Sequence, residues 1–202
     1  MTKNLSAQAA YARGVATFDT VIRQVRSDQW INPTPCLEWD VRALVNHVVG
    51  EDRWVPPLVA GLTIAEVGDA LSGDLLADDP QFSWDRARHE AERAVSGAPD
   101  DQIVALSAGA TPLAEYLWQL AADHLIHAWD LAMAIEVDLL FDDDLAAAVE
   151  DWFITWENRY RQAGAIGPRI AVPDGADRQH RLLAAFGRDA ARPIETESIR
   201  AS

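Results

Sequence analysis

Residues 112–137 read PLAEYLWQLAADHLIHAWDLAMAIEV, and this stretch decides the fold. Pro112 suits the first turn of a helix that Thr111 would cap. Leucines and one isoleucine then recur at helical spacing, namely Leu113, Leu117, Leu120, Leu131 and Ile135. The spacing therefore predicts one long helix from about residue 112 to about residue 137, with an apolar stripe that must pack against other helices.

Outward from this helix, the same periodicity recurs along the chain. Apolar residues at steps of three and four predict helices over 6–27, from about 38–40 to 54, over 83–95, over 145–162 and over 177–186, with a helical turn over 63–71. Asp40 and Asp142 to Asp144 are suitable N-caps. Pro56 and Pro57 are expected to kink or end the second helix. Residues 102–111 and 169–172 favour extended structure.

The chain shows no internal repeat and no low-complexity linker. Four or five principal helices in one unit predict a mostly α, antiparallel helical bundle. Residues 164–202 are expected to form a small C-terminal appendage that packs on it, so that residues 1–202 make one domain.

The composition excludes several classes of protein. The 202 residues include 17 Lys and Arg against 32 Asp and Glu, which gives a net charge of −15, and 49% of the residues are apolar. The apolar share is too high for a disordered chain. The negative field, with no basic cluster to oppose it, argues against nucleic acid and against an anionic membrane surface as partners.

The single cysteine, Cys36, allows no disulfide within the chain. No apolar run is long enough to span a membrane, and Met1 to Arg13 lack the apolar core of a signal peptide. We therefore expect a cytoplasmic protein. Cys36 is either a nucleophile or, more commonly for such a residue, a small buried hydrophobe. The eight tryptophans fit the core of the bundle, and they also allow a homodimer that buries one face.

Three of the five histidines lie among apolar residues. His47 follows Leu44 on the inner stripe of the second predicted helix. At about 100° per residue, His127 lies within the stripe of the long helix, while Asp123, His124 and Asp130 fall at its edges. Burying such groups is costly unless something satisfies them. By contrast, His89 and His180 stand among charged residues and are expected at the surface.

A divalent metal would satisfy these groups. Neutral imidazole and carboxylate are its natural ligands, and two ligands at positions i and i+4 of a helix converge on one point. His47 on a facing helix would complete a three-ligand site. The alternative is that these histidines are core residues bonded to backbone carbonyls. No glycine-rich nucleotide motif and no nucleophile elbow competes with either interpretation.

Three segments resemble the mycothiol-dependent maleylpyruvate isomerase family, which belongs to the wider DinB-like superfamily. Residues 34–50, TPCLEWDVRALVNHVVG, are similar to its first metal-binding segment, and residues 123–132, DHLIHAWDLA, to its second. Residues 181–189, RLLAAFGRD, are similar to the usual close of one branch of these chains. The resemblance covers nearly the whole chain, from about Ala7 to Asp189.

The resemblance implies a DinB-like four-helix bundle that holds a divalent metal, zinc or nickel, through His47, Asp123 and His127. The family's acid is Glu, so Asp123 is one methylene shorter, and His124 is a rival or an additional ligand. The resemblance further implies mycothiol, a low-molecular-weight thiol, as cofactor. The family's isomerase has a C-terminal domain that is not evident here.

These features predict a metal-dependent and mycothiol-dependent transferase or isomerase, in which the metal activates a thiol or water that acts on a small electrophile. The expected partners are therefore this thiol and a small-molecule substrate. The alternative is a bundle that binds a metal or a small molecule without catalysis. A site closed by four protein ligands, with His124 among them, would favour that alternative, whereas three ligands at a pocket would favour an enzyme.

Overall fold

The computed structural model describes residues 5–190. Its elements, in chain order, are α1 (Ala7–Ile22), α2 (Val41–Val59), α3 (Ile64–Val67), the 3₁₀ helix η1 (Gly68–Leu71), α4 (Pro80–Val95), β1 (Ile103–Leu106), β2 (Gly109–Pro112), α5 (Leu113–Ala134), α6 (Asp143–Gln162) and α7 (Arg178–Ala185). The two strands pair as an antiparallel hairpin between α4 and α5. The predicted mostly α architecture is confirmed.

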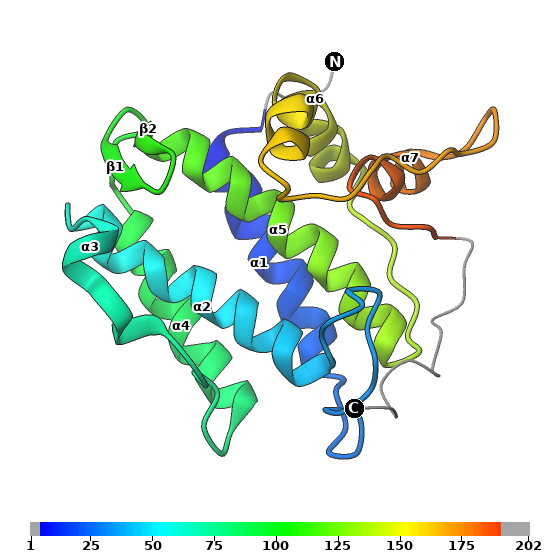
Figure 1. Ribbon diagram of the computed structural model, residues 1–202, viewed down its shortest axis with the longest axis horizontal. Coiled ribbons are helices and arrows are strands. Elements are labelled where there is room, and N and C mark those ends of the chain that lie inside the picture. Colours follow the sequence, from blue (N-terminus) through cyan, green and yellow to red (C-terminus); the bar gives the residue numbers. More distant parts are fainter. Residues whose placement is uncertain (1–4, 191–202) are drawn as a thin grey trace.

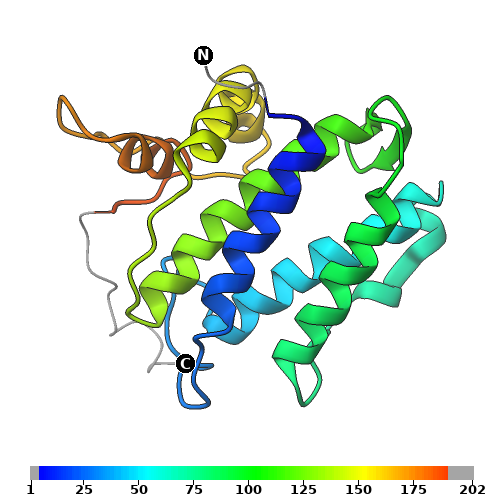
Figure 2. The ribbon, with the colours of Figure 1, turned by 180° about the vertical axis from the view of Figure 1, so that it is seen from behind.

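The bundle consists of α1, α2, α4 and α5 (Figures 1 and 2). Helices α1 and α5 run side by side in the same direction, and α2 and α4 run in the opposite direction. Because two parallel neighbours cannot be joined by a tight turn, the chain between α2 and α4 returns along the bundle, and α3 and η1 lie in this crossover. None of the described helices is long and apolar enough to cross a membrane.

Helix α5 is the centre of the fold, since 16 of its 22 residues are buried. One apolar core lies between α5 and the rest of the bundle, and includes Phe18, Leu44 and Trp84. A second core joins the other side of α5 to α6 and α7, and includes Phe153 and Leu183. A helix enclosed on both sides keeps few water-facing positions, so each polar residue on α5 requires its own explanation.

Gly14 permits the closest approach between α1 and α5. A Cβ atom at this position would lie 3.0 Å from the backbone oxygen of Ala121 and 3.3 Å from the Cβ atom of His124. The missing side chain therefore lets α1 cover the side of α5 on which His124 lies.

Side-chain caps begin several helices where the sequence predicts them. The carboxylate of Asp40 accepts a hydrogen bond from the backbone N–H of Ala43, and that of Asp142 accepts one from Leu145. The predicted helix over 83–95 is confirmed with an earlier start, because Asp79 caps it and Pro80 occupies its first position. The expected helical turn over 63–71 is present as α3 and η1.

Several local predictions differ from the structure. The helix predicted over 6–27 ends at Ile22. Helix α2 continues through Pro56 and Pro57 to Val59, because the φ of proline is close to the helical value and only two N–H donors are missing near the helix end. Pro112 ends β2 and precedes α5 instead of opening it. Residues 169–172 form no strand. The part of the predicted appendage beyond residue 190 lies outside the described residues.

Candidate metal centre

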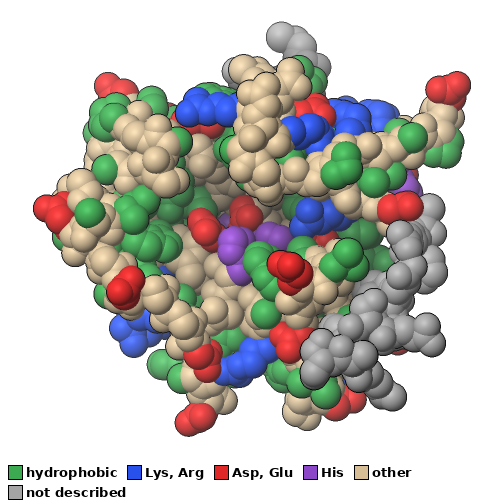
Figure 3. Space-filling model, viewed as in Figure 1, with side chains coloured by type: hydrophobic (Ala, Val, Ile, Leu, Met, Phe, Trp, Pro, Cys, Tyr) green, Lys and Arg blue, Asp and Glu red, His purple; other side chains and the backbone are tan. Residues whose placement is uncertain are grey.

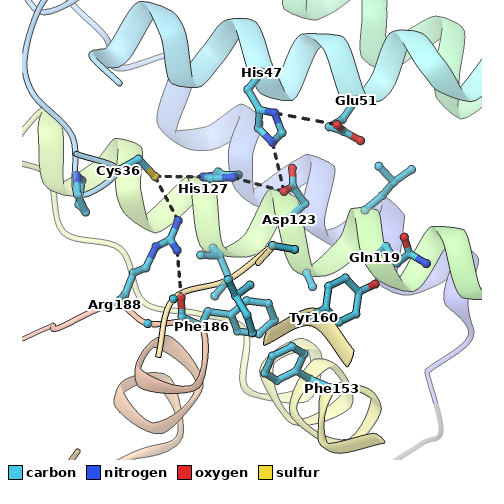
Figure 4. Close-up of a pocket in the computed structure, with 18 of the residues that line it drawn as sticks. Cys36, His47, Glu51, Gln119, Asp123, His127, Phe153, Tyr160, Phe186 and Arg188 are labelled. Carbon is cyan, nitrogen blue, oxygen red and sulfur yellow. Dashed lines mark hydrogen bonds and ion pairs between the residues drawn. The ribbon is translucent and has the colours of Figure 1, made fainter. Parts of the chain in front are cut away.

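The three predicted ligand residues meet where α2 faces α5 (Figure 4). Nε2 of His47 lies 3.4 Å from Oδ1 of Asp123, and Nε2 of His127 lies 3.4 Å from the same oxygen. Asp123 and His127 stand one helical turn apart on α5, so both side chains project from one face. We call these three residues the open cluster.

The ring of His127 is fixed through the nitrogen that faces away from the open cluster. Its Nδ1 lies 2.9 Å from Oδ2 of Asp130, a fully buried carboxylate. This carboxylate also accepts hydrogen bonds from Nε of Arg188 at 3.1 Å and from Nη2 of Arg188 at 2.8 Å. A carboxylate on Nδ1 fixes the tautomer that keeps the proton there and presents the Nε2 lone pair to the open cluster. Asp130 and Arg188 thus position His127.

The open cluster fits a divalent cation. The second carboxylate oxygen of Asp123, Oδ2, is buried and has no hydrogen-bond partner among the described residues. Two imidazole nitrogens and one carboxylate oxygen lie within 4.8 Å of one another. Imidazole and carboxylate are ordinary ligands of divalent transition metals. A cation there would satisfy the carboxylate and both rings at once.

Protonation of the open cluster follows the same logic. Burial opposes charge on both residues, yet the Asp123 carboxylate raises the pKa of His127 well above its ordinary value. The charges of His127 and His47 in turn hold the pKa of Asp123 well below its ordinary range, against the effect of burial. The cluster therefore stabilises positive charge, which either protons or a metal can supply.

His124 faces away from the open cluster. Its Nδ1 lies 2.7 Å from the backbone oxygen of Leu120, and its Nε2 lies 3.3 Å from Oδ1 of Asp52. The Tyr11 hydroxyl donates to the same Asp52 oxygen at 2.8 Å. We call Tyr11, Asp52 and His124 the sealed cluster, since none of the three side chains reaches the surface appreciably. His124 is thus neither a rival to Asp123 nor a fourth ligand in this arrangement.

The open cluster lies on the wall of a cavity of about 670 Å³. Figure 3 shows a hollow near the centre of this face, with histidine (purple) and acidic (red) side chains inside it. Glu51, one turn after His47, also lines the cavity, and its Oε1 lies 4.0 Å from Nδ1 of His47. The ring of Trp39 covers this end, with its centroid 4.8 Å from that of His47.

Sequence reasoning missed several residues of this site. The sequence singles out Arg188 only as part of the segment 181–189, because its contact with Asp130 spans 58 residues and leaves no local signal. Trp39 and Trp152 line the cavity, although the tryptophans were predicted as core. Cys36 is half-buried, and its Sγ lies 3.2 Å from Nη2 of Arg188 and 3.3 Å from Oδ2 of Asp130. It therefore contacts polar groups and not an apolar core. His89 and His180 are exposed, as predicted.

Comparisons with known proteins place the chain in a family. The model of a family described as mycothiol maleylpyruvate isomerase N-terminal domain matches residues 11–132. Uncharacterized proteins from two strains of Mycobacterium tuberculosis are each 31% identical over 143 residues, which cover 68% of this chain and 71% of theirs. No solved structure matches the chain.

Proposed function

The chain belongs to the mycothiol maleylpyruvate isomerase N-terminal domain family, with a mostly α fold consistent with a DinB-like helical domain, and from this premise we propose that it is a metal-dependent enzyme. In the proposed reaction, the low-molecular-weight thiol mycothiol either becomes bonded to a small electrophile or assists its isomerisation. The proposed metal is zinc or nickel, and the proposed ligands are His47, Asp123 and His127.

One observation carries this proposal: among residues 5–190, three ligand side chains, and not four, converge at the wall of an open cavity. Structural zinc sites are closed by four protein ligands, whereas catalytic sites keep a position for water or substrate. The orientation of His124 toward Asp52 supports the catalytic type. We further propose that residues 1–202 act as one domain, because α2, α5, α6 and the segment around Arg188 all line the cavity.

The residues around the open cluster have separate roles. Asp130 keeps the Nε2 lone pair of His127 directed at the open cluster, and Arg188 keeps Asp130 ionised and in place. A divalent metal lowers the pKa of a bound thiol, so that a thiolate exists at neutral pH. Trp39 covers the rings of His47 and His127 and excludes water from that side.

The transfer requires no reagent besides the thiol and the electrophile. The thiolate sulfur forms a bond to the electrophilic carbon, and the leaving group departs with the electron pair of the bond that breaks. The thiol proton passes to solvent. In an isomerisation the sulfur adds to a double bond and is later expelled, so that the thiol is regenerated. Neither reaction needs a side-chain nucleophile.

The first test is elemental analysis of protein purified without a metal-affinity tag. We expect about one equivalent of a transition metal in the natural protein and in the surface variant His89→Ala, and none in His127→Ala. Circular dichroism and thermal melting check that each variant is folded. Absence of metal from the natural protein, even after incubation with zinc or nickel, would refute the proposal.

The second test is consumption of mycothiol in the presence of an electrophile, compared between the natural protein and His47→Ala. We expect the variant to lose both metal and thiol transfer. A natural protein that holds its metal but consumes no thiol with any electrophile would instead favour binding without catalysis.

A further inference from the structure

The cavity wall opposite the open cluster is aromatic. Trp152, Phe153 and Tyr160 of α6 contribute to it, together with Ile166 and Phe186 (Figure 4 labels three of them). The rings support one another: those of Phe153 and Phe186 stack with centroids 4.0 Å apart, and those of Trp152 and Tyr160 meet at 6.0 Å. We call these five residues the aromatic wall. Phe153 and Phe186 are buried behind this wall, so Trp152, Tyr160 and Ile166 present most of the surface that a flat apolar body would contact.

The aromatic wall lies outside the part of the chain that matches the family model. That match covers residues 11–132 and includes the open cluster, whereas all five wall residues follow it. The cavity therefore combines a shared reactive end with a second end that belongs to the remaining part of this chain. Selectivity for the electrophile is expected to depend on the second end.

The charges around the cavity disfavour anionic ligands. Three carboxyl groups line it, from Glu38, Glu51 and Asp123, and among the described residues Arg188 is its only lysine or arginine. The guanidinium of Arg188 is already engaged, with Nε and Nη2 bonded to Asp130 and Nη1 bonded to the backbone oxygen of Phe186. A carboxylate at the aromatic wall would thus lose its water without gaining a lysine or arginine partner.

A metal would not change this balance enough to hold a dicarboxylate. A divalent ion bound by Asp123 keeps one net positive charge, and the proposed function gives that charge to the thiolate. No second cation of the described cavity is left for either carboxylate. The net charge of −15 of the whole chain also repels polyanions.

We propose that the aromatic wall is the binding subsite for the electrophile, and that this electrophile is an uncharged molecule built on a ring, not a dicarboxylate. The volume of about 670 Å³ falls in the usual range of small-molecule sites, and it leaves room for a thiol beside a ring. The inference rests on the proposed function in treating the ligand as an electrophile. The predicted preference for an uncharged ligand can be measured by binding alone, without turnover.

A matched pair of unreactive probes tests the charge preference. Dimethyl phthalate and phthalate share a ring and two carbonyl groups, and they differ in two negative charges and two methyl groups. We expect isothermal titration calorimetry to show that the diester binds at least about tenfold more tightly than the dianion, in metal-loaded protein with mycothiol present. Equal or tighter binding of phthalate, or no binding of either probe at millimolar concentration, would overturn the proposal.

Two variants locate the subsite. Ile166→Arg places a cation in the aromatic wall, and we expect it to strengthen phthalate binding about tenfold and to weaken diester binding. Ile154→Arg adds the same charge at a residue of α6 that is 68% exposed and lies outside the cavity, and it should change neither affinity. Equal effects of the two variants would overturn the assigned location.

Trp152→Ala provides a second measure if Ile166→Arg does not fold, since it should weaken diester binding about tenfold without added charge. Diester binding that survives in a protein without metal or thiol transfer would refute only the proposed function. Thiol transfer to dicarboxylates alone would refute only the present inference.

Discussion

Two neighbouring residues of α5, Asp123 and His124, belong to two clusters with nearly the same chemistry and different surroundings. In the open cluster an imidazole nitrogen lies 3.4 Å from the Asp123 carboxylate. In the sealed cluster an imidazole nitrogen lies 3.3 Å from the Asp52 carboxylate. The open cluster lines a cavity, whereas the rings of Phe18 and Trp84 enclose His124.

This difference shows that access, and not the types of residue, separates a reactive site from a structural one. Adjacent residues on a helix point about 100° apart, so neighbours can face different layers of a bundle. Here α1, through Gly14, covers the side of His124 and leaves the side of Asp123 uncovered. The sealed cluster can therefore act on stability alone, and the open cluster is free to act on a ligand.

The largest expected effect comes from breaking the sealed cluster. Asp52→Ala removes the carboxylate that balances His124, a residue with no exposed surface. Such a change leaves an uncompensated buried charge and should lower the free energy of unfolding by about 3–5 kcal/mol. Urea denaturation measures this loss, and the fraction that folds should still bind metal.

Tyr11→Phe is the matched control for the sealed cluster, since it removes one hydrogen bond to Asp52 without removing the charge. We expect a loss of about 1 kcal/mol. If Asp52→Ala costs no more than this control, the two clusters do not differ as argued.

The next largest effect concerns the support of the open cluster. Arg188→Ala removes both hydrogen bonds from the guanidinium to Asp130 and should weaken metal binding about 10–100-fold. Competition with a chromogenic chelator measures this affinity. Arg181→Ala is the control, because this arginine pairs with Glu150 and does not contact Asp130. Equal affinities in the two variants would contradict the role of Arg188 as a positioning residue.

A change of pH should affect the two clusters in opposite directions. The raised pKa of His127 means that protons compete with the metal to higher pH than at an ordinary imidazole. Metal affinity should therefore rise with pH, by about tenfold per pH unit for each proton displaced. Titration with zinc between pH 5 and about pH 8 measures this slope, and a flat profile would contradict it.

For the sealed cluster the sign reverses. Burial lowers the pKa of His124, but Asp52 outweighs it and raises the pKa above the ordinary value. A group with a raised folded-state pKa stabilises the fold fully below its unfolded pKa, about 6.5, and this contribution is lost as pH rises through the folded value. Urea unfolding of the metal-free double variant His47→Ala, His127→Ala isolates the contribution of His124. A free energy of unfolding that rises as the pH increases above about 6.5 would refute this prediction.

The smallest expected effect is at the surface. His89→Ala changes an exposed residue whose ring lies near the backbone oxygen of Asp85 on α4. It should change the free energy of unfolding by less than about 0.5 kcal/mol and leave metal content unaltered. A larger effect on either quantity would show that solvent access does not determine what the histidines of this chain contribute.

Much of this arrangement can be predicted from local sequence. The stripe from Leu113 to Leu131 predicts the central helix, and Asp40 predicts the start of α2. Spacing alone places Asp123 and His127 on one face of α5. These successes depend on helical periodicity and capping, which are properties of short segments.

The remaining features depend on contacts between distant segments. The pairing of Arg188 with Asp130 and the stacking of Phe153 on Phe186 depend on how the end of the described chain packs against α5. The orientation of His124 depends on which side of α5 is covered by α1. Periodicity places His124 at the edge of a stripe, but it does not state whether that edge faces a cavity or a neighbouring helix.

The contact of Arg188 with Asp130 also sets an order of events during synthesis. A chain that grows from its N-terminus releases His47, Asp123 and His127 from the ribosome well before Arg188, which follows Asp130 by 58 residues. The nascent bundle can therefore bring its ligands together while Asp130 still lacks its counter-charge. Capture of the metal at full strength becomes a late step of maturation, and a chain that stops short of this arginine would be made with a weakened site.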